Sequence, residues 1–267
     1  MTKIKYYIIF FSLKYNFYQD SSLFELVSNL IKKMKIAVLD LHRWIKNKVY
    51  ESVKIANTLK NYFDGEAAIF EMIRIIPPEI DLNEFSAILV SGSDSTHIEK
   101  YRGYKITREI VEKAWKQSIP VLGVCAGSQM LGKMWGLHTE FMDKPEVGWY
   151  EIELTENGMK DELFSGLPKK FVSYECHIKR IYEDESKNIN ILARSQNCIQ
   201  SVRYDEYVWG MQFHPEDTIE EGNEQIRKYN RREPSSKSAV HSPEKLVGRT
   251  VYKNFIEIAK KRSNKIT

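Results

Sequence analysis

The sequence predicts an α/β fold in which a doubly wound, mostly parallel sheet carries an antiparallel extension. Short, almost wholly apolar runs alternate with stretches of helical periodicity from residue 34 to residue 135. Strands of a parallel sheet have this composition because helices cover both of its faces. Shorter β-like pieces follow Gly136 with few helices between them, which indicates that antiparallel strands continue the same sheet.

The parallel part of the sheet is expected from the first half of the chain. Its strands are predicted at KIAVLD (35–40), AAIFEM (67–72), SAILVS (86–91) and PVLGV (120–124), with helices around 49–62 and 106–117 and a further helical pattern from Gln129. Ligands bind beyond the carboxyl ends of the strands in such sheets. Cys125 and the segment SGSDS (91–95) both follow predicted strands, so both are expected at that edge.

The antiparallel extension is predicted from five pieces: WYEIEL (149–154), KFVSY (170–174), NINILAR (188–194), IQSVRY (199–204) and VWGMQF (208–213). Residues 217–248 are polar and charged, which predicts a mobile insertion. A final helix is expected around 251–261, and the sequence contains no internal repeat.

Residues 34–267 are expected to form the domain, because MKIAVLD starts at Met34 with the first predicted strand. Residues 1–33 are then an appendage, which is either the product of a start codon assigned too early or an amphipathic helix. The apolar segment YYIIFFSL (6–13) is too short to span a bilayer, and no small-residue cleavage site follows it. We therefore expect neither a membrane span nor secretion.

Composition excludes several classes of protein. The formal net charge is only +4, far below the clustered basic surplus of a nucleic-acid binder. The three cysteines are an odd number without C-x-x-C spacing, so neither a disulfide framework nor a zinc site is predicted. We expect a cytoplasmic protein that uses no metal and no organic cofactor.

Cys125 is predicted to lie at a corner between a strand and a helix. Val121, Leu122 and Val124 form the apolar strand, and Gly127 with Ser128 allows a tight turn into the helix. Such a corner projects the thiol from the sheet and aims the positive end of the helix at the sulfur, which favours the nucleophilic thiolate. Taken alone, a cysteine here is more often a small core residue.

A base and its orienting group are predicted in the segment VWGMQFHPE (208–216). His214 and Glu216 lie just past a strand, and alternate residues of an extended chain share a face, so the carboxylate can orient the imidazole. His214 alone would more often be structural, and Glu216 alone a solvated charge. Together with Cys125 they predict a Cys-His-Glu triad.

The triad implies acyl transfer. His214 accepts the thiol proton, Cys125 attacks a carboxamide carbon, ammonia leaves, and water then hydrolyses the thioester. The oxyanion needs backbone donors, and the amides of Ala126 and of the 91–95 segment are the natural candidates.

These motifs resemble those of class I glutamine amidotransferases, the triad glutaminases. The nucleophile motif G-x-C-x-G-x-Q is matched from Gly123 to Gln129, and the second motif is matched by QFHPE (212–216). The resemblance implies the flavodoxin-like α/β fold of that family. It also implies that Gln129 and the backbone around Gly92 and Ser93 hold glutamine, beside a wall formed by Tyr174, Glu175, Cys176 and His177. Within the family, the chain is most similar to the glutaminase domain or subunit of GMP synthase.

Three features depart from that pattern. The oxyanion loop has Ser93 where the family commonly has a second glycine, so a positive φ there would carry a strain cost. Lys179 replaces an aspartate two residues after the histidine, which makes it the candidate for altered substrate choice. The sequence has no phosphate-binding loop for an acceptor, so a synthase is expected on a separate chain.

The sequence therefore predicts a glutaminase that supplies ammonia to a separate acceptor enzyme. Two other hypotheses stay open. One is a free-standing γ-glutamyl hydrolase that passes no ammonia on, and the other is a binding or regulatory protein that keeps the fold without turnover.

Overall fold

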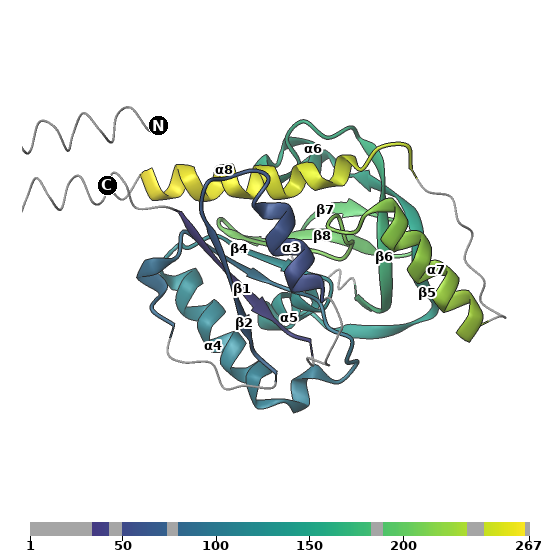
Figure 1. Ribbon diagram of the computed structural model, residues 1–267, viewed down its shortest axis with the longest axis horizontal. Helices are drawn as coiled ribbons and strands as arrows, with labels where there is room; N and C mark the ends of the chain where they lie inside the picture. Colours follow the sequence, from purple (N-terminus) through teal and green to yellow (C-terminus); the bar gives the residue numbers. More distant parts are fainter. Residues whose placement is uncertain (1–33, 43–49, 74–79, 183–188, 234–242, 265–267) are drawn as a thin grey trace, which may run out of the picture. The chain divides into compact units, whose positions relative to one another are not determined.

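A nine-stranded sheet organises the residues that the computed structural model describes, which are 34–42, 50–73, 80–182, 189–233 and 243–264. The strand order is β2-β1-β3-β4-β9-β8-β7-β5-β6 (Figure 1). The predicted appendage at 1–33 lies outside the described residues.

The parallel half comprises β2 (Glu66–Glu71), β1 (Lys35–Asp40), β3 (Ala87–Val90), β4 (Val121–Val124) and β9 (Val208–Met211). Each neighbouring pair in this series is parallel. Four helices accompany it: α3 (Glu51–Leu59), α4 (Arg102–Lys116), α5 (Ala126–Met134) and α8 (Thr250–Asn264). The predicted parallel strands are thus confirmed, and β9, predicted as part of the extension, joins them.

Helices pack on both faces of the parallel strands. Ile36 and Val38 of β1 lie in one apolar cluster with residues of α3 and α8, whereas Ala37 and Leu39 lie in another with residues of α4 and α5 (Figure 1). Successive side chains of a strand point to opposite faces, so each strand contributes to both clusters. This is the doubly wound arrangement that the apolar runs predict.

The antiparallel half comprises β8 (Ile199–Asp205), β7 (Asn190–Arg194), β5 (Thr139–Leu154) and β6 (Lys170–Ile181). Strands β5 and β6 extend well beyond the predicted WYEIEL and KFVSY. Their added parts pair with each other across a register shift between Phe141 and Glu146. The added part of β5 contains Pro145 and several charges, so it has none of the alternation from which a strand is predicted.

The sequence predicts a mobile insertion at 217–248, and this prediction is wrong for the first half of the segment. A helix, α7 (Ile219–Arg232), forms there. The helix begins with a reciprocal capping box between Thr218 and Glu221. Only Gly222 and Ile226 of this helix are buried. The composition of the helix is therefore as polar as that of a solvated segment, which is why its sequence suggests an insertion.

Short elements complete the described fold: η1 (Leu82–Glu84), η2 (Ile98–Lys100), α6 (Glu156–Lys160), η3 (Glu162–Phe164) and η5 (Val247–Arg249). In the part of the chain that the structure describes, no helix combines the length and the apolar character needed to cross a membrane.

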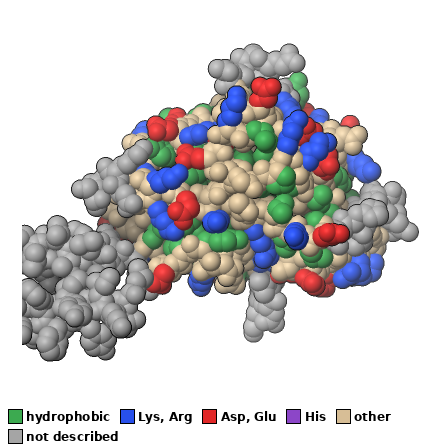
Figure 2. Space-filling model, turned by 90° about the horizontal axis from the view of Figure 1, so that it is seen from above, with side chains coloured by type: hydrophobic (Ala, Val, Ile, Leu, Met, Phe, Trp, Pro, Cys, Tyr) green, Lys and Arg blue, Asp and Glu red, His purple; other side chains and the backbone are tan. Residues whose placement is uncertain are grey.

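The surface charges are mixed in sign. On the face seen in Figure 2, Lys and Arg side chains are interspersed with Asp and Glu side chains and with single hydrophobic ones. A nucleic-acid binder instead gathers its basic residues on one face or along one helix. The described surface in this view therefore agrees with the small net charge of the sequence.

Candidate active site

Cys125 lies at the predicted corner between β4 and α5, and its backbone is strained there. Its φ of 50° and ψ of −109° lie outside the regions that residues with a side chain prefer. The turn is tight because a Cβ at Gly127 would lie 2.3 Å from the carbonyl oxygen of Val90. Sharp turns of this kind expose a nucleophile at the edge of a sheet.

His214 reaches the same edge because β9 is the parallel neighbour of β4. Val124 is paired with Met211, and the Cys125 amide donates to the Met211 carbonyl at 2.8 Å. The His214 amide in turn donates to the Tyr174 carbonyl at 2.8 Å, which ties this loop to β6.

Glu216 contacts the imidazole of His214, for which the sequence predicts it as the orienting group. The Nδ1 atom of His214 lies 2.9 Å from Oε1 of Glu216, and the hydroxyl of Tyr252 donates to Oε2 of Glu216 at 2.7 Å. Both glutamate and histidine are buried. Nε2 of His214 is buried without a hydrogen-bond partner at ordinary distance among the described residues, and Cys125 is the thiol that interacts with this imidazole.

The electrostatics around His214 favour its charged form. Burial acts to lower its pKa, but its interactions with Glu51, Cys125 and Glu216 outweigh burial and raise the pKa well above its ordinary value. An imidazolium beside a thiolate is the resting ion pair of many cysteine hydrolases.

The predicted oxyanion residues occupy the loop after β3 and the start of α5. The amide of Ala126 is the first of its helix and therefore has no acceptor inside that helix. The amide of Gly92, by contrast, already donates to Oε1 of Glu51 at 2.8 Å. Ser93 does not adopt a positive φ, because among the described residues other than glycine only Ser118 and Cys125 do.

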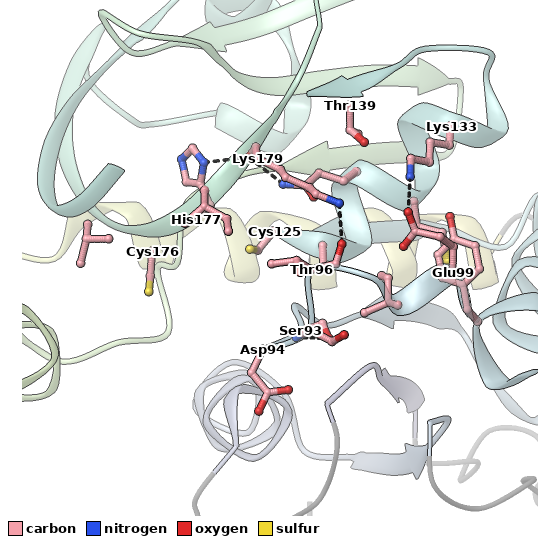
Figure 3. A pocket seen from close by; sticks show the side chains of 18 of the residues that line it. Ser93, Asp94, Thr96, Glu99, Cys125, Lys133, Thr139, Cys176, His177 and Lys179 are labelled. Carbon is pink, nitrogen blue, oxygen red and sulfur yellow. Dashed lines mark hydrogen bonds and ion pairs between the residues drawn. The ribbon is translucent and has the colours of Figure 1, made fainter. Parts of the chain in front are cut away.

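A cavity of about 280 Å³ opens beside Cys125 (Figure 3). Its lining includes most of the predicted site residues: Ser93, Cys125, Ala126, Gln129, Cys176, His177 and Lys179. Tyr174 and Glu175 are not in the lining, although they were expected in the wall. Both are fully buried, because the side chain of Tyr174 packs against Trp149 and His214 and that of Glu175 lies beside His177.

Gln129 is held in place by β6. Its Nε2 donates to the Lys179 carbonyl at 2.9 Å and to Oε1 of Gln212 at 3.0 Å. Both amide hydrogens are therefore engaged, and the side-chain oxygen is the group of Gln129 that can accept a hydrogen bond from a ligand.

Lys179 spans the cavity from β6 to the loop after β3. Its ammonium group donates to the carbonyl oxygen of Thr96 and lies 4.8 Å from the centre of the Phe141 ring (Figure 3). Lys133 and Glu99, 3.0 Å apart, form a further ion pair in the cavity lining. The pocket thus holds charges of both signs.

A second Cys-His-Glu group lies beside the cavity and has no counterpart in the sequence prediction. Nε2 of His177 lies 2.9 Å from Glu146 and 3.2 Å from Glu175, and Nδ1 lies 2.9 Å from the Lys179 carbonyl. Burial lowers the pKa of His177, but the two carboxylates outweigh this and raise it to about 10. The thiol of Cys198 lies 3.5 Å from Glu146.

The chemistry of this second group differs from that at Cys125. Burial, together with Glu146 and Glu175, raises the pKa of Cys198 and so opposes thiolate formation. Both ring nitrogens of His177 are engaged, so neither is free to accept the Cys198 proton. The arrangement is that of a buried hydrogen-bonded network.

Metal-ligand types occur in both groups. The donor atoms of Glu146, His177 and Cys198 lie within 4.8 Å of one another, as do those of Glu51, His214 and Glu216. Such donors can bind zinc. The hydrogen bonds and ion pairs described above already satisfy these charges without a cation.

Comparison with known proteins identifies relatives for the part of the chain that contains Cys125, His214 and Glu216. The family model described as glutamine amidotransferase class-I matches residues 49–230. A GMP synthase (glutamine-hydrolyzing) subunit of Pyrococcus abyssi is 32% identical over 155 residues, which are 57% of this chain and 80% of that protein. The GMP synthase of Borreliella burgdorferi strain N40 is 36% identical over 151 residues, 56% of this chain but only 28% of that protein.

Solved structures show the same fold at low sequence identity. A glutamine amidotransferase from Thermotoga maritima superimposes with a TM-score of 0.67 at 21% identity, covering 85% of this chain and 98% of that one. A glutamine amidotransferase from Methylobacillus flagellatus gives a TM-score of 0.60 at 15% identity, covering 86% and 94%. The family model spans more than half of the chain, and the chain therefore belongs to the class I glutamine amidotransferase family.

Proposed function

We propose that this chain hydrolyses the side-chain amide of glutamine through a thioester on Cys125. The observation that carries the proposal is the meeting of Cys125 and His214 at the ends of neighbouring strands, with Glu216 on the far nitrogen of the imidazole. A strained nucleophile, a base and an orienting carboxylate are the three parts that a triad hydrolase needs.

The reaction begins from the ion pair. The Cys125 thiolate attacks the carboxamide carbon, and the carbonyl π electrons move to oxygen. Amides at the Ala126 turn and in the loop at Ser93 donate to this oxyanion. As the oxyanion collapses, the carbon–nitrogen bond breaks, His214 gives its proton to the leaving nitrogen, and ammonia departs. His214 then removes a proton from water, which attacks the thioester and releases glutamate.

Ammonia release by the purified protein tests this proposal. Supply of glutamine should give ammonia and glutamate in equal amounts, and the activity should not need added metal or nucleotide. A protein that binds glutamine without forming either product would instead be a binding protein that keeps the fold.

The ammonia is proposed to serve a second polypeptide. Two relatives in which this chain matches 80% and 75% of the length are each named as one subunit of GMP synthase, so those proteins belong to enzymes of more than one subunit. We expect the isolated chain to release ammonia weakly and a cognate synthase subunit to raise the rate at least about tenfold, because docking can turn the donor amides of the loop after β3 toward the oxyanion. Full activity that no synthase changes would favour the γ-glutamyl hydrolase.

Lys179 decides how well the pocket accepts glutamine. A cation in the lining repels the α-ammonium of the substrate by roughly 1 kcal/mol at a partly solvated position, which corresponds to about fivefold in KM. We expect Lys179→Met to lower the KM for glutamine by about this factor with little change in kcat. Lys116→Met is the matched control, because Lys116 is exposed and is not among the residues that line the cavity.

A raised KM in Lys179→Met would mean that the ammonium group contributes to binding. The preferred substrate would then be another γ-glutamyl compound whose additional anionic group pairs with Lys179, which would favour the hydrolase alternative. Steady-state kinetics on glutamine and on γ-glutamyl dipeptides distinguish the two outcomes.

A further inference from the structure

Glu51 connects two parts of the proposed site that are far apart in the sequence. It is the first residue of α3, at the end of the sheet where Cys125 lies. One oxygen of its carboxylate accepts the Gly92 amide at 2.8 Å, and the other lies 3.5 Å from Nδ1 of His214. The loop after β3 and the base are therefore in contact with the same side chain.

The surroundings of Glu51 are built around its carboxylate. The side chain is only 12% exposed, and His42, which is held by Asp40 at 2.8 Å, lies 3.7 Å away on another side. Glycine at position 92 permits the close approach, because a Cβ there would lie 2.4 Å from Oε2 of Glu51. An oxyanion loop with a larger residue at this position would push the carboxylate away.

Opposing interactions set the pKa of this carboxylate. Burial raises the pKa of Glu51 to about 7; Glu216 acts in the same direction, while His214, His42 and the Gly92 amide act against it. These groups, with Asp40 and Asp94 beside His42 and the hydroxyl of Tyr252 on α8, are the charged and titratable neighbours of this carboxylate among the described residues.

We infer that Glu51 is a positioning residue that fixes the oxyanion loop and stabilises the Cys125–His214 ion pair; this rests on the proposed function. Its hydrogen bond from Gly92 holds the Ser91–Gly92 peptide in one place, and its negative charge stabilises the imidazolium of His214. Glu51 touches neither the substrate nor the sulfur in this role.

Two substitutions separate the two parts of the role. Glu51→Gln keeps a side-chain oxygen for the Gly92 amide and removes the charge, so the loop stays in place while the ion pair is weakened. The basic limb of the pH profile of kcat/KM should then move to lower pH, because the imidazolium of His214 loses its proton at lower pH without the negative charge. Glu51→Ala should move the basic limb in the same way and also lower kcat at least about tenfold, with KM little changed.

The matched control is Glu112→Gln, which removes an exposed carboxylate on α4 that pairs only with Lys116 among the described residues. Its pH profile should equal that of the wild type. If Glu51→Ala does not fold, Glu51→Gln is sufficient for the test, because it is expected to change the pH profile of kcat/KM and not the stability of the fold.

Alkylation of Cys125 by iodoacetamide gives a readout that needs no turnover. In Glu51→Gln the change in alkylation rate that accompanies loss of the His214 proton should move to lower pH relative to the wild type. If the wild type released no ammonia but this shift appeared, the proposed glutaminase would fail and the role of Glu51 would stand. Profiles of alkylation and of kcat/KM that superimpose for wild type and Glu51→Gln would overturn the inference.

Discussion

Replacing Cys125 with alanine is expected to reduce ammonia release from glutamine by at least about a thousandfold, because the covalent route is lost and only the oxyanion donors and substrate binding remain. Fold and stability should change little, since the side chain is small and lies at the edge of the core. Initial rates of ammonia release at saturating glutamine measure the loss.

Cys198→Ser is the matched control for this prediction. Cys198 lies in the second Cys-His-Glu group, where His177 has no free nitrogen, so activity should stay within about threefold of the wild type. A loss of activity in Cys198→Ser as large as that in Cys125→Ala would mean that the network beside the cavity carries the chemistry.

Replacing Glu146 with alanine is expected to destabilise the fold by about 3–5 kcal/mol, because it leaves a buried histidinium without its main partner. Glu146 is fully buried and accepts from Ser195, Asn197 and Gln200 as well as from His177. Glu151→Ala on the same strand is the control, since its exposed pair with Lys170 contributes little. Urea unfolding at pH 7 compares the two variants.

The stabilisation by the Glu146–His177 pair also depends on pH. The folded-state pKa of His177 is raised to about 10, so its contribution is complete below the ordinary value of 6.5 and is lost as pH rises through 10. Burial acts to raise the pKa of Glu146, but its hydrogen bonds outweigh burial and lower the pKa, so the contribution of this carboxylate is lost as pH falls below 4.5. The difference between wild type and Glu146→Ala should therefore shrink at pH 10.5 relative to pH 7. An equal difference at both pH values would contradict the charged pair.

Local signals in the sequence were sufficient for the nucleophile corner and for the His-x-Glu segment. Cys125 and His214 each follow a short apolar strand, and both strands formed where the pattern predicts them. The pattern does not give the strand order, however. That β9 returns to lie beside β4 after four antiparallel strands is a property of the whole sheet, and it is this adjacency that brings the two residues together.

Side-chain contacts between distant segments had no sequence signal. Glu51 meets Gly92 across 41 positions and His214 across a still longer separation, so neither periodicity nor a motif indicates the contact. The same holds for Glu146 and His177, which lie on β5 and β6 beyond the predicted ends of both strands. The capping box of α7, in contrast, can be recognised in the sequence as the motif T-x-x-E. This motif indicates the start of a helix even though the segment that follows is polar.

Mapping the covalent adduct of a glutamine-like electrophile tests the central claim most directly. The wild-type protein is incubated with a γ-electrophilic glutamine analogue, digested and analysed by peptide mass spectrometry, with glutamine added as a competitor. The account predicts one adduct, on the peptide that contains Cys125, with labelling slowed by glutamine and abolished in His214→Ala at neutral pH. Labelling on Cys198 or Cys176 that glutamine protects, with Cys125 unmodified, would contradict it.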